Sequence, residues 1–196
     1  MANARFSVAP AYYTGSEVTP EVTVTHSGKT LVKDRDFTVT YHNNIEPSSY
    51  YNSPWVGIDG IGNYQGYVTK SFTINRADIS SCTVTLSDES LTYTGSSLRP
   101  TATVKSGDKE LTLNQDYYVS YRNNWDAGTA SAILTGTGNY TGSVTKDFTI
   151  KPLDISRYSA SLSQYSYTSD GTEKCPDVTV TYGDKTLATG TDFTVS

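Results

Sequence analysis

The side chains best suited to catalysis or metal binding are few in this sequence. Its histidines are His26 and His42, and neither belongs to a metal-binding spacing such as His-Glu-x-x-His. Its cysteines, Cys82 and Cys175, are far apart and form no Cys-x-x-Cys pair. The sequence therefore predicts no catalytic residues, no metal site and no cofactor, and we interpret Cys82 as a small apolar residue of a core.

Two aspartates, Asp36 and Asp116, stand 80 positions apart in matching surroundings. Recurring carboxylates can bind calcium, but no Asp-x-Asp-x-Asp-Gly loop contains either of them. We interpret each aspartate as the cap of the turn before a strand that starts at Phe37 or Tyr117. A glycosidase could still use two carboxylates that are distant in sequence, and a screen for polysaccharide hydrolysis would reveal it.

Two lysines, Lys70 and Lys146, occupy the same place in a repeated motif that continues to Phe72 or Phe148. Alternation from these phenylalanines predicts that both lysines face inward. A buried ammonium is costly unless it is paired, neutralised or covalently used, so both lysines are candidates for an intramolecular cross-link. One alternative is a β-bulge that turns the side chain outward. The other is that the aliphatic part of the side chain carries the ammonium group to solvent at the end of the domain. A cross-link would lower the intact mass by about 17–18 Da.

Aromatic residues are the remaining candidates for a binding site. Tyr50, Tyr51 and Trp55 lie in a segment of small polar residues, and alternation predicts that Trp55 faces outward. Trp125 directly follows a pair of asparagines. Exposed Tyr and Trp bind sugars and proteins because they bury a large area with little loss of entropy. The alternative is that these rings cover the sandwich ends or line a joint between repeats.

The elements that must position these residues come from an internal repeat. Two motifs, Tyr-Thr-Gly and Gly-x-Gly-Asn-Tyr, occur twice each, at 13–15 and 93–95 and at 60–64 and 136–140. The offset falls from 80 to 76 residues, so the first copy carries four extra residues between Asn44 and Gly60. A third copy begins at Asp154 and reaches the counterpart of Ser120 at Ser196. We therefore expect the chain to be a piece of a longer tandem array.

Each copy consists of short segments in which apolar and polar residues alternate, as they do in half-buried strands. The apolar positions are, in the second copy, Cys82, Val84, Leu86, Ala102, Val104, Tyr117, Val119, Tyr121, Ala130, Ala132, Leu134, Phe148 and Ile150, and, at the start of the first copy, Ala2, Ala4 and Phe6. Turn motifs separate these segments at the spacing of an all-β sandwich. The sequence predicts an all-β fold of tandem small immunoglobulin-like β-sandwiches. A β-solenoid is the alternative, but its coils repeat every ~20–30 residues.

Three residues separate neighbouring copies, at 75–77 and at 151–153. Such a linker spans at most ~10 Å, and Pro152 stiffens the second one, so we expect the sandwiches to abut end to end as a rod. The predicted parts are repeat 1 at 1–76, repeat 2 at 77–152 and the N-terminal part of a truncated repeat 3 at 153–196.

The composition limits the partners. A net charge of −5 without a Lys/Arg cluster argues against nucleic acid or an acidic membrane as the main partner. No stretch approaches the ~20 consecutive apolar residues that cross a bilayer, so we expect no direct membrane insertion. The expected partners are neighbouring repeats of the same chain and, through the aromatic segment, a glycan or a protein.

The run Asp-Tyr-Tyr-Val-Ser-Tyr-Arg-Asn-Asn at 116–124, with Ala-Gly-Thr-Ala at 127–130 and Gly-Asn-Tyr-Thr-Gly at 138–142, resembles a known family. It is similar to the tandem bacterial immunoglobulin-like repeats of large cell-surface proteins, found chiefly in Gram-positive gut and oral bacteria. This resemblance implies an extracellular, wall-attached protein of the adhesin type. Its modules would act as non-enzymatic stalk segments or, alternatively, as adhesive segments. The sequence shows no signal peptide and no Leu-Pro-x-Thr-Gly motif, so cell-wall anchoring is implied by the resemblance alone.

Overall fold

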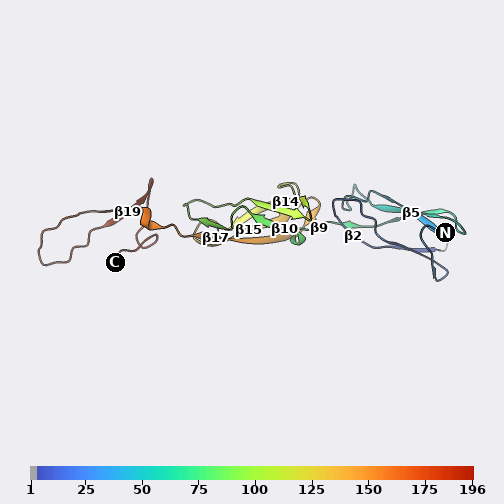
Figure 1. Cartoon of the computed structure of the whole chain (residues 1–196), viewed down its shortest axis with the longest axis horizontal. Helices are drawn as coiled ribbons and strands as arrows, with labels where there is room; N and C mark the ends of the chain where they lie inside the picture. The colour runs from blue at the N-terminus through green and yellow to red at the C-terminus, as the bar shows by residue number, and fades with distance from the viewer. Residues whose placement is uncertain (1–3) are drawn as a thin grey trace. The chain divides into compact units, whose positions relative to one another are not determined.

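Residues 4–196 are described by a computed structural model, apart from the side chains of Ala4, Arg157 and Tyr182. They belong to two compact units, and the chain passes from the larger to the smaller between Lys151 and Pro152. Their regular structure consists of β-strands and two short 3₁₀ helices (Figure 1). The prediction of an all-β fold is therefore confirmed.

The strands follow the alternating segments of the sequence. In repeat 1 they are β1 (Ala4–Val8), β2 (Ala11–Tyr12), β3 (Val22–His26), β4 (Lys29–Thr30), β5 (Phe37–His42), β6 (Trp55–Gly60), β7 (Tyr67–Ser71) and β8 (Ile74–Asn75). In repeat 2 they are β9 (Ala77–Asp78), β10 (Thr83–Leu86), β11 (Ser90–Thr92), β12 (Ala102–Ser106), β13 (Lys109–Glu110), β14 (Tyr117–Arg122), β15 (Gly128–Gly136), β16 (Tyr140–Thr141) and β17 (Ser143–Lys151).

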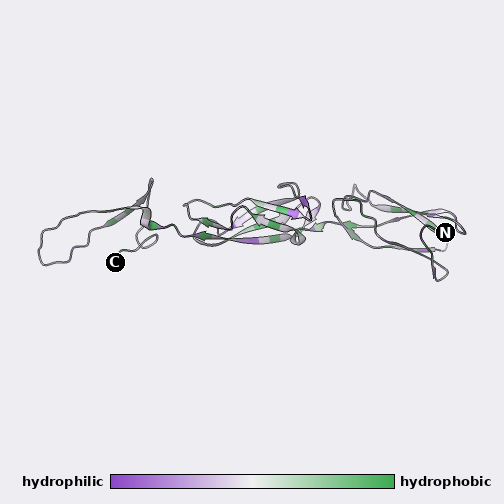
Figure 2. Ribbon diagram, viewed as in Figure 1, coloured by the Kyte–Doolittle hydropathy of each residue, from purple (hydrophilic) through white to green (hydrophobic). Residues whose placement is uncertain are grey.

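Repeat 2 contains a sheet in the order β10-β12-β13 and a sheet in the order β11-β17-β15-β14. Side chains from both sheets meet in one core, to which β12 contributes Val104 and β15 contributes Ala132 and Leu134. The intervening residues of β15 are only partly buried, as strand alternation predicts. Hydrophobic segments lie along the strands of the larger unit (Figure 2). The arrangement is consistent with a β-sandwich.

The first strand of repeat 1 aligns differently from the sequence-based expectation. Phe6 pairs with Val24, and Val84 pairs with Val104, so Phe6 corresponds to Val84 rather than to Leu86. The offset is thus 78 residues here, not 80. A shift of two residues keeps the same side chains on the inner face, so Phe6 still packs against the core. Ala2, also assigned to this face, lies outside the described residues.

The two repeats differ most where repeat 1 has its four extra residues. In repeat 2 the ladder between β15 and β17 extends back to Gly128, which pairs with Ile150. In repeat 1 the matching strand β6 starts only at Trp55, because the preceding Pro54 has no N–H to donate to a ladder. Pro54 is fully buried, and its carbonyl accepts a hydrogen bond from the N–H of Phe72. The residues before Pro54 therefore leave the sheet as a loop.

The repeated Tyr-x-Asn-Asn motif is explained by hydrogen bonds that span each repeat. The hydroxyls of Tyr41 and Tyr121 each donate to the carbonyl of a proline 21 residues earlier, at 2.6 Å. The amides of the buried Asn44 and Asn124 each donate to a carbonyl 26 residues earlier, at 3.2 and 2.9 Å. Burial raises the pKa of both tyrosines. The motif thus ties β5 or β14 to the segment that leads into β3 or β12.

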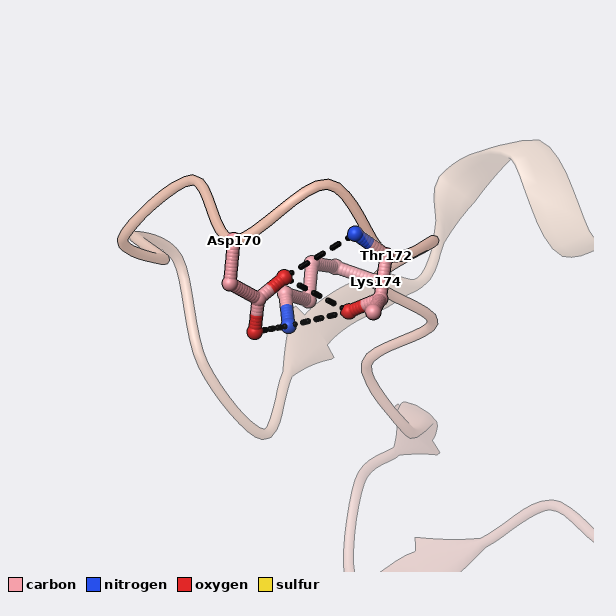
Figure 3. Close-up of polar contacts among 3 residues, drawn as sticks. All are labelled: Asp170, Thr172 and Lys174. Carbon is pink, nitrogen blue, oxygen red and sulfur yellow. Dashed lines mark hydrogen bonds and ion pairs between the residues drawn. The ribbon is translucent and has the colours of Figure 1, made fainter.

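The smaller unit contains the 3₁₀ helix Ile155–Arg157 and one sheet in the order β18-β19-β20, from β18 (Ser159–Leu162), β19 (Val178–Tyr182) and β20 (Lys185–Thr186). Val180 is buried, but all four residues of β18 are exposed. The loop between β18 and β19 is held by a polar cluster. Asp170 accepts hydrogen bonds from Thr172 and Lys174, and the ammonium of Lys174 also donates to the Thr172 hydroxyl at 2.7 Å (Figure 3).

This cluster predicts an acid-sensitive loop. Lys174, together with Thr172, lowers the pKa of Asp170 to about 2. Because the folded-state pKa is depressed, the loop contacts are complete above the ordinary aspartate pKa of about 3.9 and are lost as the pH falls through about 2. We expect an NMR titration of the Asp170 carboxyl carbon to show this low midpoint, and Lys174→Met to raise it. A wild-type midpoint near the ordinary value would contradict the ion pair.

Candidate functional site

The aromatic segment of repeat 1 forms the loop Ser48–Ser53, which we call the tyrosine loop and which carries Tyr50 and Tyr51. Tyr50 and Tyr51 are 92% and 94% exposed, and they are the most exposed large hydrophobic side chains of the described chain. Their ring centroids lie 5.0 Å apart with an interplanar angle of 86°, so the edge of one ring faces the plane of the other. The two rings contact each other while facing solvent.

Hydrogen bonds fix the loop beneath these rings. The N–H of Ser48 donates to the carbonyl of Ile74 at 2.8 Å, and the hydroxyl of Ser48 accepts from the N–H of Ile74 at 2.9 Å. The N–H of Ser49 donates to the carbonyl of Asn52 at 2.9 Å, while the Ser49 hydroxyl accepts from the N–H groups of Tyr51 and Asn52. The Asn52 amide donates to the carbonyl of Glu46 at 2.8 Å. The loop is therefore attached to β8 and closed on itself.

Trp55 lies apart from these tyrosines. Its ring stacks on the ring of His42, with centroids 3.9 Å apart and an interplanar angle of 15°. The two residues are opposite each other in the pairing of β5 with β6, and Trp55 is half-buried. Among these four residues, the ring contacts join Tyr50 to Tyr51 and Trp55 to His42. The predicted aromatic site of repeat 1 thus consists of two separate pairs.

Trp125 is 59% exposed and lines an open cleft of about 460 Å³. The other residues that line this cleft are Asn123, Asp126, Ala127, Gly128 and Thr129. Asn123, Trp125, Asp126 and Ala127 belong to the connection between β14 and β15. Gly128 and Thr129 are the first residues of β15. This cleft is far in sequence from the tyrosine loop and belongs to the other repeat.

The two candidate cross-link lysines reach solvent. Lys70 is exposed, and the side chain of Lys146 is 40% exposed, with its ammonium 3.2 Å from the carboxylate of Glu89. Lys70 lies opposite the buried Val56 and Lys146 opposite the buried Ala132, so both share the inner face, as alternation predicts. Because their side chains nevertheless reach solvent, the burial cost that suggested a cross-link is absent. The cross-link itself stays a prediction.

The recurring aspartates close turns, as the sequence predicted. The carboxylates of Asp36 and Asp116 accept hydrogen bonds from the N–H groups of Val32 and Thr112, each at 2.8 Å. Arg35 bonds to the Asp36 carboxylate and lowers its pKa. In the part of the chain that the structure describes, no three His, Cys, Asp or Glu residues gather in a way that could hold a metal ion.

The cysteines and histidines have separate surroundings. Cys82 packs against the core of the larger unit, as expected, and burial raises the pKa of its thiol. Cys175 is an exposed free thiol in the smaller unit. The ring of His26 lies edge to face with that of Tyr64, with centroids 6.0 Å apart.

A contact between repeats 1 and 2, which the sequence did not identify, lies inside the larger unit. Tyr13 of repeat 1 is buried in the same core cluster as Tyr140 of repeat 2, and their rings meet edge to face at 5.7 Å. The Lys109 ammonium donates to the Tyr13 hydroxyl at 3.4 Å and lies 5.6 Å from the ring centroid, and the hydrogen bond raises the pKa of Lys109. The sequence repeats Tyr13 at Tyr93, but this recurrence does not show that Tyr13 contacts the next repeat.

A second contact of this joint comes from Glu46, which precedes the tyrosine loop. The amide of Asn139 donates to the carboxylate of Glu46 at 2.7 Å. The linker also takes part, because β9 pairs in parallel with β16 and the N–H of Ala77 donates to the carbonyl of Asn139 at 3.0 Å. Repeat 1 therefore contacts repeat 2 through the buried ring of Tyr13 and through Glu46, while the linker residue Ala77 pairs with β16.

No protein-family model matches the chain, and a search of curated proteins finds no match. Within residues 4–196 there is also no helix with the length and apolar character needed to cross a bilayer.

Proposed function

We propose that the chain is a set of non-enzymatic structural modules from the stalk of a bacterial cell-surface protein of the adhesin type. In this proposal residues 1–76, 77–152 and 153–196 are successive immunoglobulin-like modules, the last one truncated, joined end to end as a rod. The protein would be extracellular and attached to the cell wall of a Gram-positive bacterium, as the family resemblance implies.

The observation that carries this proposal is the packed joint between repeats 1 and 2. Modules that hold a binding domain away from a surface need fixed joints, since flexible linkers let neighbouring domains reorient. Tyr13 is 8% exposed and Tyr140 is 1% exposed, so the joint buries aromatic area rather than linking two independent surfaces. Burial of such area supports a semi-rigid pair of modules.

The joint can be tested by residual dipolar couplings measured for repeats 1 and 2 in the full chain. We expect both repeats to share one alignment tensor, because the joint holds them as a single body. Tyr13→Ala is expected to give each repeat its own tensor. The matched control is Tyr12→Ala, since Tyr12 is the adjacent strand residue but is 65% exposed. Separate tensors in the wild-type chain would overturn the proposal of a rigid joint.

The alternative function is a binding module for a glycan or a host extracellular protein. Its support is the fixed tyrosine loop of repeat 1, which carries two nearly fully exposed rings. Repeat 2 replaces this loop with continuous ladder pairing between β15 and β17. The two functions are compatible, because one loop of a stalk module can carry a ligand site.

A further inference from the structure

We propose that the loop Ser48–Ser53 inserts the rings of Tyr50 and Tyr51 into a concave pocket on a protein partner. This inference rests on the alternative function above and names the class of partner. The binding role differs from the stalk role because the joint uses Glu46, which precedes the tyrosine loop, and leaves both rings exposed.

The first support is that the two rings contribute little to the packing of the described chain. Each ring contacts the other, and their exposed fractions of 92% and 94% leave almost the whole side chain in water. Exposed aromatic carbon is unfavourable in water, and its burial in a partner's pocket would remove that cost. The other exposed tyrosines of the larger unit lie on strands, Tyr12 on β2, Tyr67 on β7 and Tyr118 on β14.

The second support is that the loop is ordered before any partner binds. The Ser48 hydrogen bonds to Ile74 fix its base, and the Ser49 and Asn52 bonds close the turn that carries the tyrosines. A preorganised loop loses little conformational entropy on binding, so more of the contact energy appears as affinity. Ser, Tyr and Asn make up all of residues 48–53, and these residue types dominate the loops through which antibodies bind proteins.

The third support is the angle between the rings. At 86° the edge of one ring points at the face of the other, so the pair forms a convex wedge. A sugar ring stacks on a flat aromatic platform, whereas these two rings stand at a right angle and form no single flat surface. A wedge of two aromatics fits the desolvated pockets in which interface hot spots are found. Among the two partner classes, the geometry therefore favours a protein.

The test is surface plasmon resonance of the full chain over immobilised fibronectin, fibrinogen, laminin and collagen, with a glycan array run in parallel. We expect one of the proteins to bind. Tyr50→Ala and Tyr51→Ala are each expected to weaken that binding by about 30-fold or more, the loss typical of a hot-spot residue. Asn52→Ala keeps both rings but loosens the loop, and we expect it to weaken binding by about 10-fold.

Tyr118→Ala is the matched control, because it removes a tyrosine that is 48% exposed outside the loop, and its binding is expected to equal that of the wild type. Circular dichroism is expected to be unchanged in all variants. Glycan binding that the loop variants abolish would overturn the protein partner and keep the loop as a binding site. Protein binding that survives both tyrosine variants, or no binding in either assay, would overturn the loop as a binding site and leave the stalk proposal intact.

Discussion

Replacing Tyr140 by alanine is expected to destabilise the larger unit by about 3–5 kcal/mol, the usual loss when a buried large aromatic becomes alanine. Tyr140 is 1% exposed and is among the largest fully buried side chains of the described chain. Its ring belongs to the core cluster that also contains Val104 and Leu134, and it forms the edge-to-face contact with Tyr13. The variant therefore loses packing within repeat 2 and across the joint.

Urea denaturation of the full chain, followed by circular dichroism, measures this loss. The matched control is Tyr64→Ala, because Tyr64 holds the same motif position in repeat 1 but is only partly buried, against His26 and the core of repeat 1. We expect a clearly smaller loss for the control. Equal losses would mean that the contact of Tyr140 with Tyr13 adds nothing to the free energy of unfolding.

Replacing Gly142 by alanine is the second change with a large expected effect. Gly142 has a φ of +76°, and a Cβ built there would lie within 2.4 Å of an Asp78 carboxylate oxygen. That carboxylate caps the 3₁₀ helix Ile79–Ser81 by accepting a hydrogen bond from the N–H of Ser80 at 2.9 Å. The alanine would both strain the backbone and displace the cap, at a total cost of about 2–4 kcal/mol.

Gly66 provides an internal control for this prediction. It is the counterpart of Gly142 in repeat 1, and it also has a positive φ, of +98°, but nothing lies within 4 Å of its built Cβ. Gly66→Ala is therefore expected to cost only the backbone strain, about 1–2 kcal/mol. Urea denaturation of both variants separates the two contributions. Similar losses at the two positions would show that the Asp78 carboxylate moves aside freely.

The sequence predicted the strands well because period-2 alternation marks which side chains face the core. Ala130, Ala132 and Leu134 were expected on one face, and all three are fully buried. The two-residue difference in β1 was missed because no shared motif lies between that strand and Tyr13, so nothing fixed the alignment. A shift of two residues also leaves the alternation unchanged.

The candidate site was only partly predictable. Tyr50 and Tyr51 were recognised from their residue types, and Trp55 was expected to join them. The pairing of Trp55 with His42 depends on the β5–β6 register, which periodicity alone does not give. Alternation assigned Lys146 a face, but it could not show that its ammonium reaches solvent and lies beside the carboxylate of Glu89. The contact of Glu46 with Asn139 joins residues 93 positions apart, and no local pattern reports it.

The parallel pairing of short strands has a mechanical consequence for both repeats of the larger unit. In repeat 1, β2 near the start pairs in parallel with β8 at the end, and in repeat 2, β11 pairs in parallel with β17. When a repeat is pulled by its two ends, these paired strands, one from its first part and one from its end, must slide lengthwise past each other. Their hydrogen bonds must then break together rather than one at a time. Tension along the chain is therefore resisted as shear, and the force needed depends on the barrier to unfolding rather than on equilibrium stability.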